Sequence, residues 1–396
     1  MATRERKDIL TLTDNEKDNL IRAWIALQDP NNGTAGVDQF FPIAGLHGQP
    51  FRGPGYGNSS WWGGYCHHGN VLFPTWHRAY LLHLEDTIRK LPDHSNFALP
   101  YWNEMRDETS GGSTSVIPRI FTDSKYTFKE GPDRGRTVDN PLYSYTLAKG
   151  FRDNLSRPNT DYSKPKGYKT VRYPYSGLVG PGQQLNTGIH NAAVEAVGEE
   201  KRIEYLNNLV KRWLEDHTEP AASSPIPGLR SKYRLCLSTS DYTVFSNTTS
   251  AAKWNDDNGR PPLAVSLESP HNGLHLAVGG YDMPYALTFS GANGDMGEND
   301  TASFDPIFYF HHCFIDKVFW AWQREGRRIT IREGYPGTNS VDDQGPTPDV
   351  KPGEWLTIDT PLHPFKFSDV VATSKASNTP LQRAVDKHHS SYADDL

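Results

Sequence analysis

The sequence predicts a mainly α-helical protein in which the helices pack as a bundle, with long irregular loops and a few short strands outside. Its 10 tryptophans, 19 tyrosines and 17 phenylalanines supply bulky core side chains, while 34 glycines and 29 prolines favour long connections. Residues 304–322 are apolar nearly all round, which is typical of a helix buried inside a larger core. No linker, repeat or break in composition divides the chain, so we expect residues 1–396 to form one domain.

Composition and charge exclude several classes of protein. The formal net charge of −6 provides no basic footprint, so we expect no nucleic-acid partner. No run of eighteen apolar residues is present, so we expect no membrane-spanning segment. The first ten residues lack the apolar core of a signal peptide, and the three cysteines are too few for a secreted disulfide framework. These features predict an intracellular protein.

The first predicted helix lies near the N-terminus. Thr13 and Glu16 have the spacing of a capping box, and apolar residues then recur at helical intervals, which predicts a helix over residues 14–28. A glycine-rich aromatic loop follows over residues 42–65 and contains His47.

A second helix is predicted to begin after Thr75 and to end before Pro92. With Thr75 as its cap, His77 lies in the first helical turn. Residues 105–187 are polar and rich in glycine, proline and tyrosine, and show no sustained period. We therefore expect surface loops with short strands there.

The middle of the chain contains two more predicted helices, over residues 188–197 and 201–214, because apolar residues recur there on one face. Residues 218–262 are expected to be loop. Ser269 and Pro270 then fit the cap and the first position of a further helix.

The most apolar helix follows a glycine-rich loop over residues 279–300. Asp305 can cap this helix and Pro306 fits its first position, where a missing N–H has no cost, and it continues through Trp322. A strand is expected over residues 355–358.

Histidines gather on the predicted helices in a way that indicates metal binding. His271 and His275 are four residues apart, so they lie on one face of a predicted helix. His311 and His312 are adjacent in the buried helix, where each imidazole needs a binding partner. The six that the helices can bring together are His47, His68, His77, His271, His275 and His312. Two sets of three imidazoles without a matching set of carboxylates or thiolates leave both copper and zinc open.

A resemblance narrows this choice. Cys66-x-His68, followed by Trp76-His77-Arg78, His271-x-x-x-His275 and Asp305-Pro306-x-Phe308-x-x-His311-His312, resembles the type 3 copper proteins, which are the tyrosinases, catechol oxidases and molluscan hemocyanins. The resemblance covers roughly residues 40–325. It implies a four-helix bundle around two copper ions.

The resemblance also implies which residues hold each ion. Copper A, in a segment of about residues 40–90, is assigned to His47, His68 and His77. Copper B, in a segment of about residues 265–325, is assigned to His271, His275 and His312. His311 is expected to orient its neighbours from outside the coordination sphere.

Further residues acquire expected roles from the same resemblance. Cys66 is expected to form a thioether with the ring of His68. Phe308 is expected to overhang copper B and to stack on an aromatic substrate. Glu268 and Asn272 are expected to hold a water that accepts the proton of a phenol.

These residues favour a tyrosinase, which hydroxylates monophenols at the ortho position and oxidises o-diphenols to o-quinones, using small phenols and O₂. A catechol oxidase or o-aminophenol oxidase, without phenol hydroxylation, is the alternative, and a hemocyanin-like O₂ carrier ranks behind both. No C-terminal plug domain is expected in this chain. The resemblance leaves room for a copper-delivering partner, and the oligomeric state is open.

Overall fold

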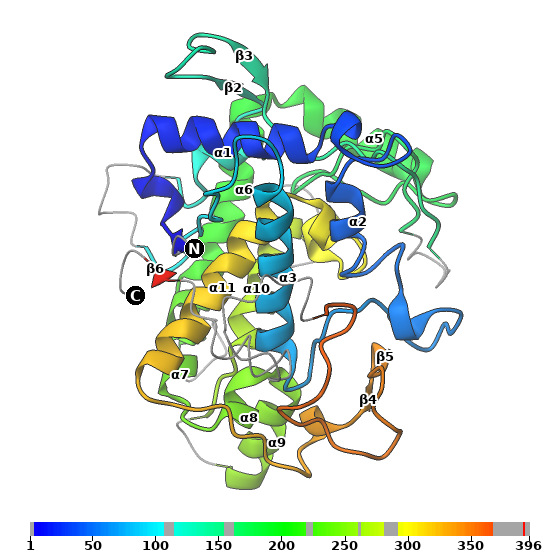
Figure 1. The fold of residues 1–396 in the computed structure, drawn as a ribbon, viewed down its shortest axis with the longest axis vertical. Helices are drawn as coiled ribbons and strands as arrows, with labels where there is room; N and C mark the ends of the chain where they lie inside the picture. The colour runs from blue at the N-terminus through cyan, green and yellow to red at the C-terminus, as the bar shows by residue number, and fades with distance from the viewer. Residues whose placement is uncertain are drawn as a thin grey trace.

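Helices α3 (Phe73–Arg89), α10 (Glu268–Gly279) and α11 (Ile307–Arg324) occupy the centre of the molecule (Figure 1). In the computed structural model α3 packs along α11, and α10 contacts α11 together with α6 (Glu199–Leu214) and α7 (Leu229–Ser238). The predicted mainly α class is confirmed, and the centre is a helical bundle as expected.

The structure describes residues 4–106, 115–153, 162–218, 225–259, 263–280, 292–366 and 391–392. Outside the central bundle, the other α-helices of these residues are α1 (Asp14–Leu27), α2 (Phe40–Ala44), α4 (Arg119–Thr122), α5 (Gln184–Ala196), α8 (Tyr242–Ser246) and α9 (Thr248–Asn258). Their strands are β1 (Glu5–Arg6), β2 (Lys125–Thr127), β3 (Thr137–Asp139), β4 (Val341–Asp342), β5 (Gly345–Pro346) and β6 (Ser391–Tyr392). None of the described helices is long and apolar enough to cross a membrane.

The helix α1 forms as its sequence predicts. The Thr13 hydroxyl accepts from the backbone N–H of Glu16, whose carboxylate accepts from the backbone N–H of Thr13, so the capping box is complete. The inward stripe of α1 includes Trp24, whose ring stacks on Phe310 of α11 at 5.6 Å. The aromatic residues of α11 are thereby covered on the side facing α1.

The start of α3 differs from the prediction. The helix begins at Phe73, so Thr75 is its third residue rather than its cap, and its hydroxyl donates to the carbonyl of Leu72. Pro74 occupies the second position, where its missing N–H breaks no helical bond. His77 is consequently the fifth helical residue and lies beyond the first turn.

The start of α10 also differs. The helix begins at Glu268, after Leu267, which makes no side-chain cap bond, so Ser269 is the second residue and not the cap. Pro270 is the third residue, still within the turn whose N–H groups lack helical partners. Glu268 therefore belongs to the helix that carries two of the candidate metal ligands.

The cap of α11 works as predicted although the boundary is shifted by one residue. Pro306 lies just before the first helical residue, and the carboxylate of Asp305 accepts from the N–H of Ile307 at 3.1 Å. The helix then continues to Arg324, slightly beyond Trp322. Every residue from Ile307 to Trp320 is buried, as expected for the most apolar helix.

The prediction of a loop over residues 218–262 is wrong. The described residues there form α7, α8 and α9. Asp241 caps α8 by accepting from the N–H of Thr243, and Asn247 caps α9 by accepting from the N–H of Ser250. The helix α5 likewise begins four residues earlier than predicted, at Gln184.

Short strands do occur between residues 105 and 187, where β2 and β3 pair antiparallel. The strand predicted over residues 355–358 is wrong, because Trp355 makes only an isolated bridge to Asn339. Half of the glycine-rich loop predicted over 279–300, namely 281–291, lies outside the described residues.

The two ends of the chain meet beside the bundle, where β1 pairs parallel with β6 (Figure 1). The guanidinium of Arg6, which is fully buried, donates to Glu85 of α3 at 2.8 and 3.0 Å and to Asp316 of α11 at 2.7 Å. It also donates to the hydroxyl of Tyr392 at 3.1 Å. The N-terminal strand thus fastens α3, α11 and the last described residues to one another.

Candidate metal centre

Three histidines converge between α10 and α11. His271 and His275 come from successive turns of α10, and His312 comes from α11. The Nε2 atom of His312 lies 3.1 Å from the Nε2 of His271 and 3.1 Å from the Nε2 of His275. Three nitrogens bound tetrahedrally at about 2.0–2.1 Å from one metal would lie about 3.3 Å apart, so this spacing fits a shared ion.

Hydrogen bonds of the Nδ1 atoms of His271 and His275 determine that their Nε2 atoms face the proposed ion. The Nδ1–H of His275 donates to the carbonyl of Met296 at 2.9 Å, and that of His271 donates to the amide oxygen of Asn272 at 2.8 Å. Both Nε2 atoms therefore present lone pairs to His312. A single N–H on His312 could satisfy only one of them, whereas a metal ion satisfies all three, so the donor set fits the ion.

A second set of three lies on the other side of the centre. His47 follows α2 in a loop, His68 precedes α3, and His77 is on α3. The Nε2 atoms of His47 and His77 are 3.4 Å apart, and the ring of His68 lies 5.2 and 5.1 Å from their rings. The Nδ1–H groups of His47 and His77 donate to the carbonyls of Asn299 and Phe73, so their Nε2 atoms also point inward as lone pairs.

The two sets face each other directly. The rings of His77 and His312 are stacked at 4.7 Å, and those of His68 and His271 at 5.6 Å. The structure thus brings together all six histidines that the sequence singled out, in two adjacent sets of three.

Burial prepares these six side chains for metal binding. Burial and, to a smaller extent, the neighbouring imidazoles lower the pKa of each imidazole below its usual 6.5, to about 3 for His68 and His275. Neutral imidazole is the form that coordinates a metal, so no proton has to be removed at neutral pH.

Cys66 lies beside the first set. Its Sγ lies within 4.8 Å of ligand nitrogens of both His47 and His68, and its thiol donates to the carbonyl of His47. The amide of Gln344 donates to Sγ at 2.8 Å and accepts from the backbone N–H of His68 at 2.7 Å. Burial raises the pKa of the Cys66 thiol to about 12. The thioether with His68 stays a prediction, and Gln344 is a neighbour that sequence reasoning missed.

His311 lies behind the second set. Its ring stacks on His271 at 5.2 Å, and its Nδ1 forms a hydrogen bond of 2.6 Å with the buried carboxyl of Glu104. Tyr233 of α7 donates to the other oxygen of this carboxyl. Burial raises the pKa of Glu104 well above its usual range and lowers that of His311 to about 3, so the pair is held neutral. Glu104 was also missed, because it lies in a loop far from His311 in sequence.

A cavity of about 570 Å³ opens onto the histidines and is lined by Glu268 and Asn272. Glu268 is buried, and its carboxylate accepts from the backbone N–H groups of Gly69 at 2.7 Å and Thr248 at 2.8 Å. Burial raises the pKa of this carboxyl and the two N–H groups oppose the shift. Asn272 is exposed. The side chains of both residues can therefore reach a phenol that is bound in the cavity.

Phe308 lies deep in the core beside the histidines. Its ring is fully buried, stacks on His312 at 3.9 Å and meets His47 edge-on at 4.9 Å. It is not among the described residues that line the cavity. Its contacts in the structure support the rings of two histidines, and its stacking on an aromatic substrate stays a prediction.

Two adjacent sets of three imidazoles, all buried except the half-buried His68, define a dinuclear metalloprotein with an all-histidine ligand set on a helical bundle. The family model described as the common central domain of tyrosinase matches residues 37–325. The chain belongs to the tyrosinase family, and its cofactor is accordingly a pair of copper ions. It is a type 3 copper oxidoreductase that acts on phenolic substrates with O₂.

Individual relatives agree with this assignment. A tyrosinase from Aspergillus oryzae is 51% identical over 395 residues, which cover 93% of this chain and 70% of the relative. A tyrosinase from a Hahella species is 43% identical over 374 residues, covering 88% of this chain and 64% of the relative. The solved structure of a tyrosinase from Burkholderia thailandensis at low pH has a TM-score of 0.76 and 44% identity, covering 92% of this chain and 71% of that one.

Proposed function

We propose that this chain is a tyrosinase, which uses O₂ to hydroxylate monophenols at the ortho position and to oxidise the resulting o-diphenols to o-quinones. The observation that carries the proposal is the convergence of two three-imidazole sets at the floor of a cavity that also contains Glu268 and Asn272.

In this proposal His47, His68 and His77 hold copper A, and His271, His275 and His312 hold copper B. Bound copper supplies O₂ activation and the electron transfer that oxidises the phenol. The protein supplies six neutral ligands in fixed tautomers. Backbone carbonyls accept from the Nδ1–H groups of His47, His77 and His275, so folding of the main chain sets the direction of these rings.

Glu268 and Asn272 handle the proton of the substrate. The carboxylate of Glu268 is held by two backbone N–H groups, and burial raises its pKa toward the range in which it can accept a phenolic proton through a water. Asn272 accepts from His271 with its amide oxygen, which leaves the amide N–H₂ group to orient that water. Phe308 keeps the ring of His312 in place from the opposite side.

The alternative, a catechol oxidase or o-aminophenol oxidase, uses the same histidines but does not hydroxylate monophenols. A hemocyanin-like carrier requires a covered site, and the cavity of about 570 Å³ beside the imidazoles argues against it because it is large enough for a phenol. An intracellular location stays a prediction of the sequence, and a copper-delivering partner stays open.

The test measures initial O₂ uptake by copper-loaded protein with a monophenol and with the matching catechol, together with copper counted per chain. Two coppers with uptake on both substrates support the proposal, and uptake on the catechol alone identifies the catechol oxidase. Asn272→Ala should lower monophenol activity more than catechol activity. Asn258→Ala, which removes an exposed amide on α9, serves as the matched control.

A further inference from the structure

Carboxylates surround the cavity above the candidate metal centre. Glu268, Glu298, Asp300 and Asp343 all line it. Among the described residues that line the same cavity there is no lysine and no arginine. The described lining around a bound substrate is therefore acidic, apart from the imidazoles.

These carboxylates lie at different depths. Asp343 is exposed in the turn between β4 and β5, and its backbone carbonyl accepts from the N–H of Trp62, another lining residue, at 3.0 Å. Glu298 is half-buried, and its carboxylate accepts from the side-chain amide of Asn293 at 3.0 Å. Asp300 is 6% exposed. The acidic lining thus extends from the mouth of the cavity inward.

The cations nearest to this lining are already engaged. Arg52, whose charge reaches Asp300, donates to the backbone carbonyls of Trp61 and Trp62. Lys164, whose charge reaches Glu298, forms an ion pair with Asp295 at 3.2 Å. Neither lines the cavity.

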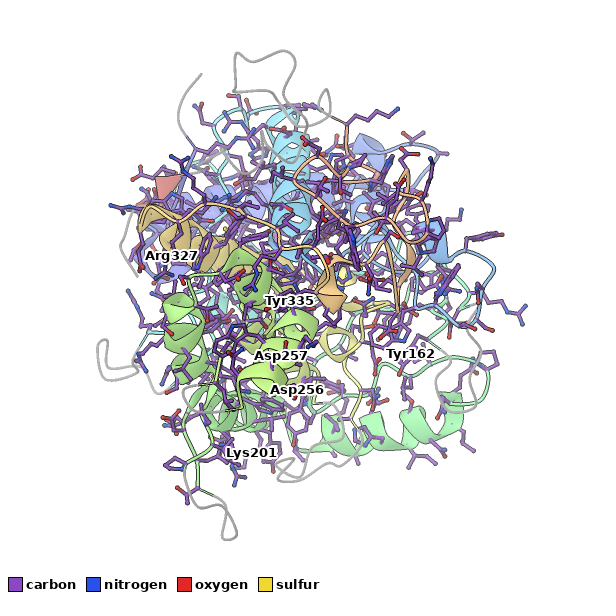
Figure 2. The ribbon with its side chains drawn as sticks, turned by 90° about the horizontal axis from the view of Figure 1, so that it is seen from below. Tyr162, Lys201, Asp256, Asp257, Arg327 and Tyr335 are labelled. Atoms are coloured by element: carbon purple, nitrogen blue, oxygen red, sulfur yellow. The ribbon has the colours of Figure 1, made fainter. Side chains whose placement is uncertain are left out.

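Figure 2 labels two further basic side chains. Figure 2 shows Lys201 and Arg327 well apart from Tyr162, a lining residue of the cavity. Neither of the two cations lines the cavity.

A para-substituted phenol enters this cavity in one useful orientation. Its oxygen must approach the imidazoles, so its para substituent points toward the mouth. Bound copper places positive charge at the oxygen end, where it favours the phenolate, while the carboxylates are the charges that surround the tail. A cationic tail is attracted there and an anionic tail is repelled.

Resting on the proposed function, we propose that this acidic lining selects phenols that carry an amine at the tail over phenols that carry a carboxylate, with Asp300 and Asp343 as specificity-determining residues. Neutral phenols rank between the two classes.

The experiment compares the holoenzyme on three monophenols of similar length: tyramine, 4-ethylphenol and 3-(4-hydroxyphenyl)propionate. The pH is held at about 8, because burial raises the pKa of Asp300 to about 7 and that of Glu298 in the same direction. We expect kcat/KM to fall in the order given, by about tenfold or more from the amine to the carboxylate at low salt. The ratio should shrink at about 0.5 M salt, because the exposed carboxylate is screened.

Variants of the lining carboxylates test whether these residues cause the preference for an amine tail. Asp343→Asn and Asp300→Asn should each lower the ratio of amine to carboxylate kcat/KM by about threefold or more. Asp139→Asn removes one carboxylate from the exposed strand β3, far from β4 and β5 in Figure 1, and should leave the ratio unchanged. Equal ratios in the wild-type protein and the two lining variants would overturn the inference.

A matched catechol series separates this inference from the proposed function. Dopamine, 4-ethylcatechol and 3-(3,4-dihydroxyphenyl)propionate carry the same three tails. If only catechols are oxidised but the same order of tails holds, the inference stands and the tyrosinase proposal fails. If monophenols are hydroxylated without preference among tails, the proposal stands and the inference fails.

Discussion

Asp300→Asn should change how the stability of the protein depends on pH. The carboxyl of Asp300 is 6% exposed, and burial raises its pKa from 3.8 to about 7, with Asp153 and Glu298 adding to the shift. The backbone carbonyl of Asp300 accepts from the N–H of Gln49 at 3.0 Å independently of the side chain. The substitution therefore removes the charge while this backbone bond is kept.

The sign follows from proton binding. A carboxyl whose pKa is higher in the folded state binds more protons there, so stability falls as pH rises from the unfolded to the folded pKa. The shift from 3.8 to about 7 corresponds to about 4 kcal/mol across that window, of which we expect at least about 2 kcal/mol to be observed. Asparagine has no such dependence, so the variant should gain stability relative to the wild-type protein as pH rises.

The assay is urea unfolding of the copper-free wild-type protein and of the variant at about pH 5, 6.5 and 8. Asp139→Asn, at an exposed position, controls for the loss of one charge and should show no gain over this range. Copper loading should move the window to lower pH, because the ions favour the carboxylate. A difference between variant and wild type that is constant from pH 5 to 8 would refute the reasoning.

Three further outcomes are expected. Glu104→Leu should destabilise the protein by about 2–5 kcal/mol, because His311 and Tyr233 each lose a buried partner, and Glu104→Gln should cost less; urea unfolding measures both. Arg6→Met should lower the free energy of unfolding by about 3 kcal/mol, because the buried Glu85 carboxylate loses its hydrogen bonds from Arg6. Equal stability of this variant and the wild-type protein would contradict this prediction. Removing copper by dialysis against cyanide should lower the thermal midpoint, and re-addition of copper should restore it, since an ion at 1,000 times its Kd stabilises by about 4 kcal/mol.

The sequence predicted those parts of the fold that depend on local signals. The capping box at Thr13 and Glu16 and the apolar run of α11 are local, and both form as expected. Helices α8 and α9 were missed although Asp241 and Asn247 cap them, because the segments between the caps are short or polar and lack an apolar period. The start of α3 was misplaced, because Thr75 has the residue type of a cap but lies inside the helix.

The candidate site was predicted to the extent that its residues follow a spacing. The four-residue interval of His271 and His275 placed both on one face of α10, where the structure has them. Glu104 and Gln344 could not be found in this way, since their partners lie 207 and 276 residues away and are brought close only by tertiary packing. Phe308 has the expected spacing from His312 and stacks on its ring, but that its ring is fully buried depends on tertiary packing, which spacing alone does not show.

The pairing of β1 with β6 sets the order of events during biosynthesis. Arg6 is made before its partners Glu85, Asp316 and Tyr392, of which Tyr392 is made last. The ribosome must release Tyr392 before this cluster can close, so α3 and α11 complete their attachment only after translation of that segment. Metal insertion that requires the finished cluster would therefore follow translation of Tyr392, and a nascent chain stalled before Tyr392 should take up less copper than one that extends past it.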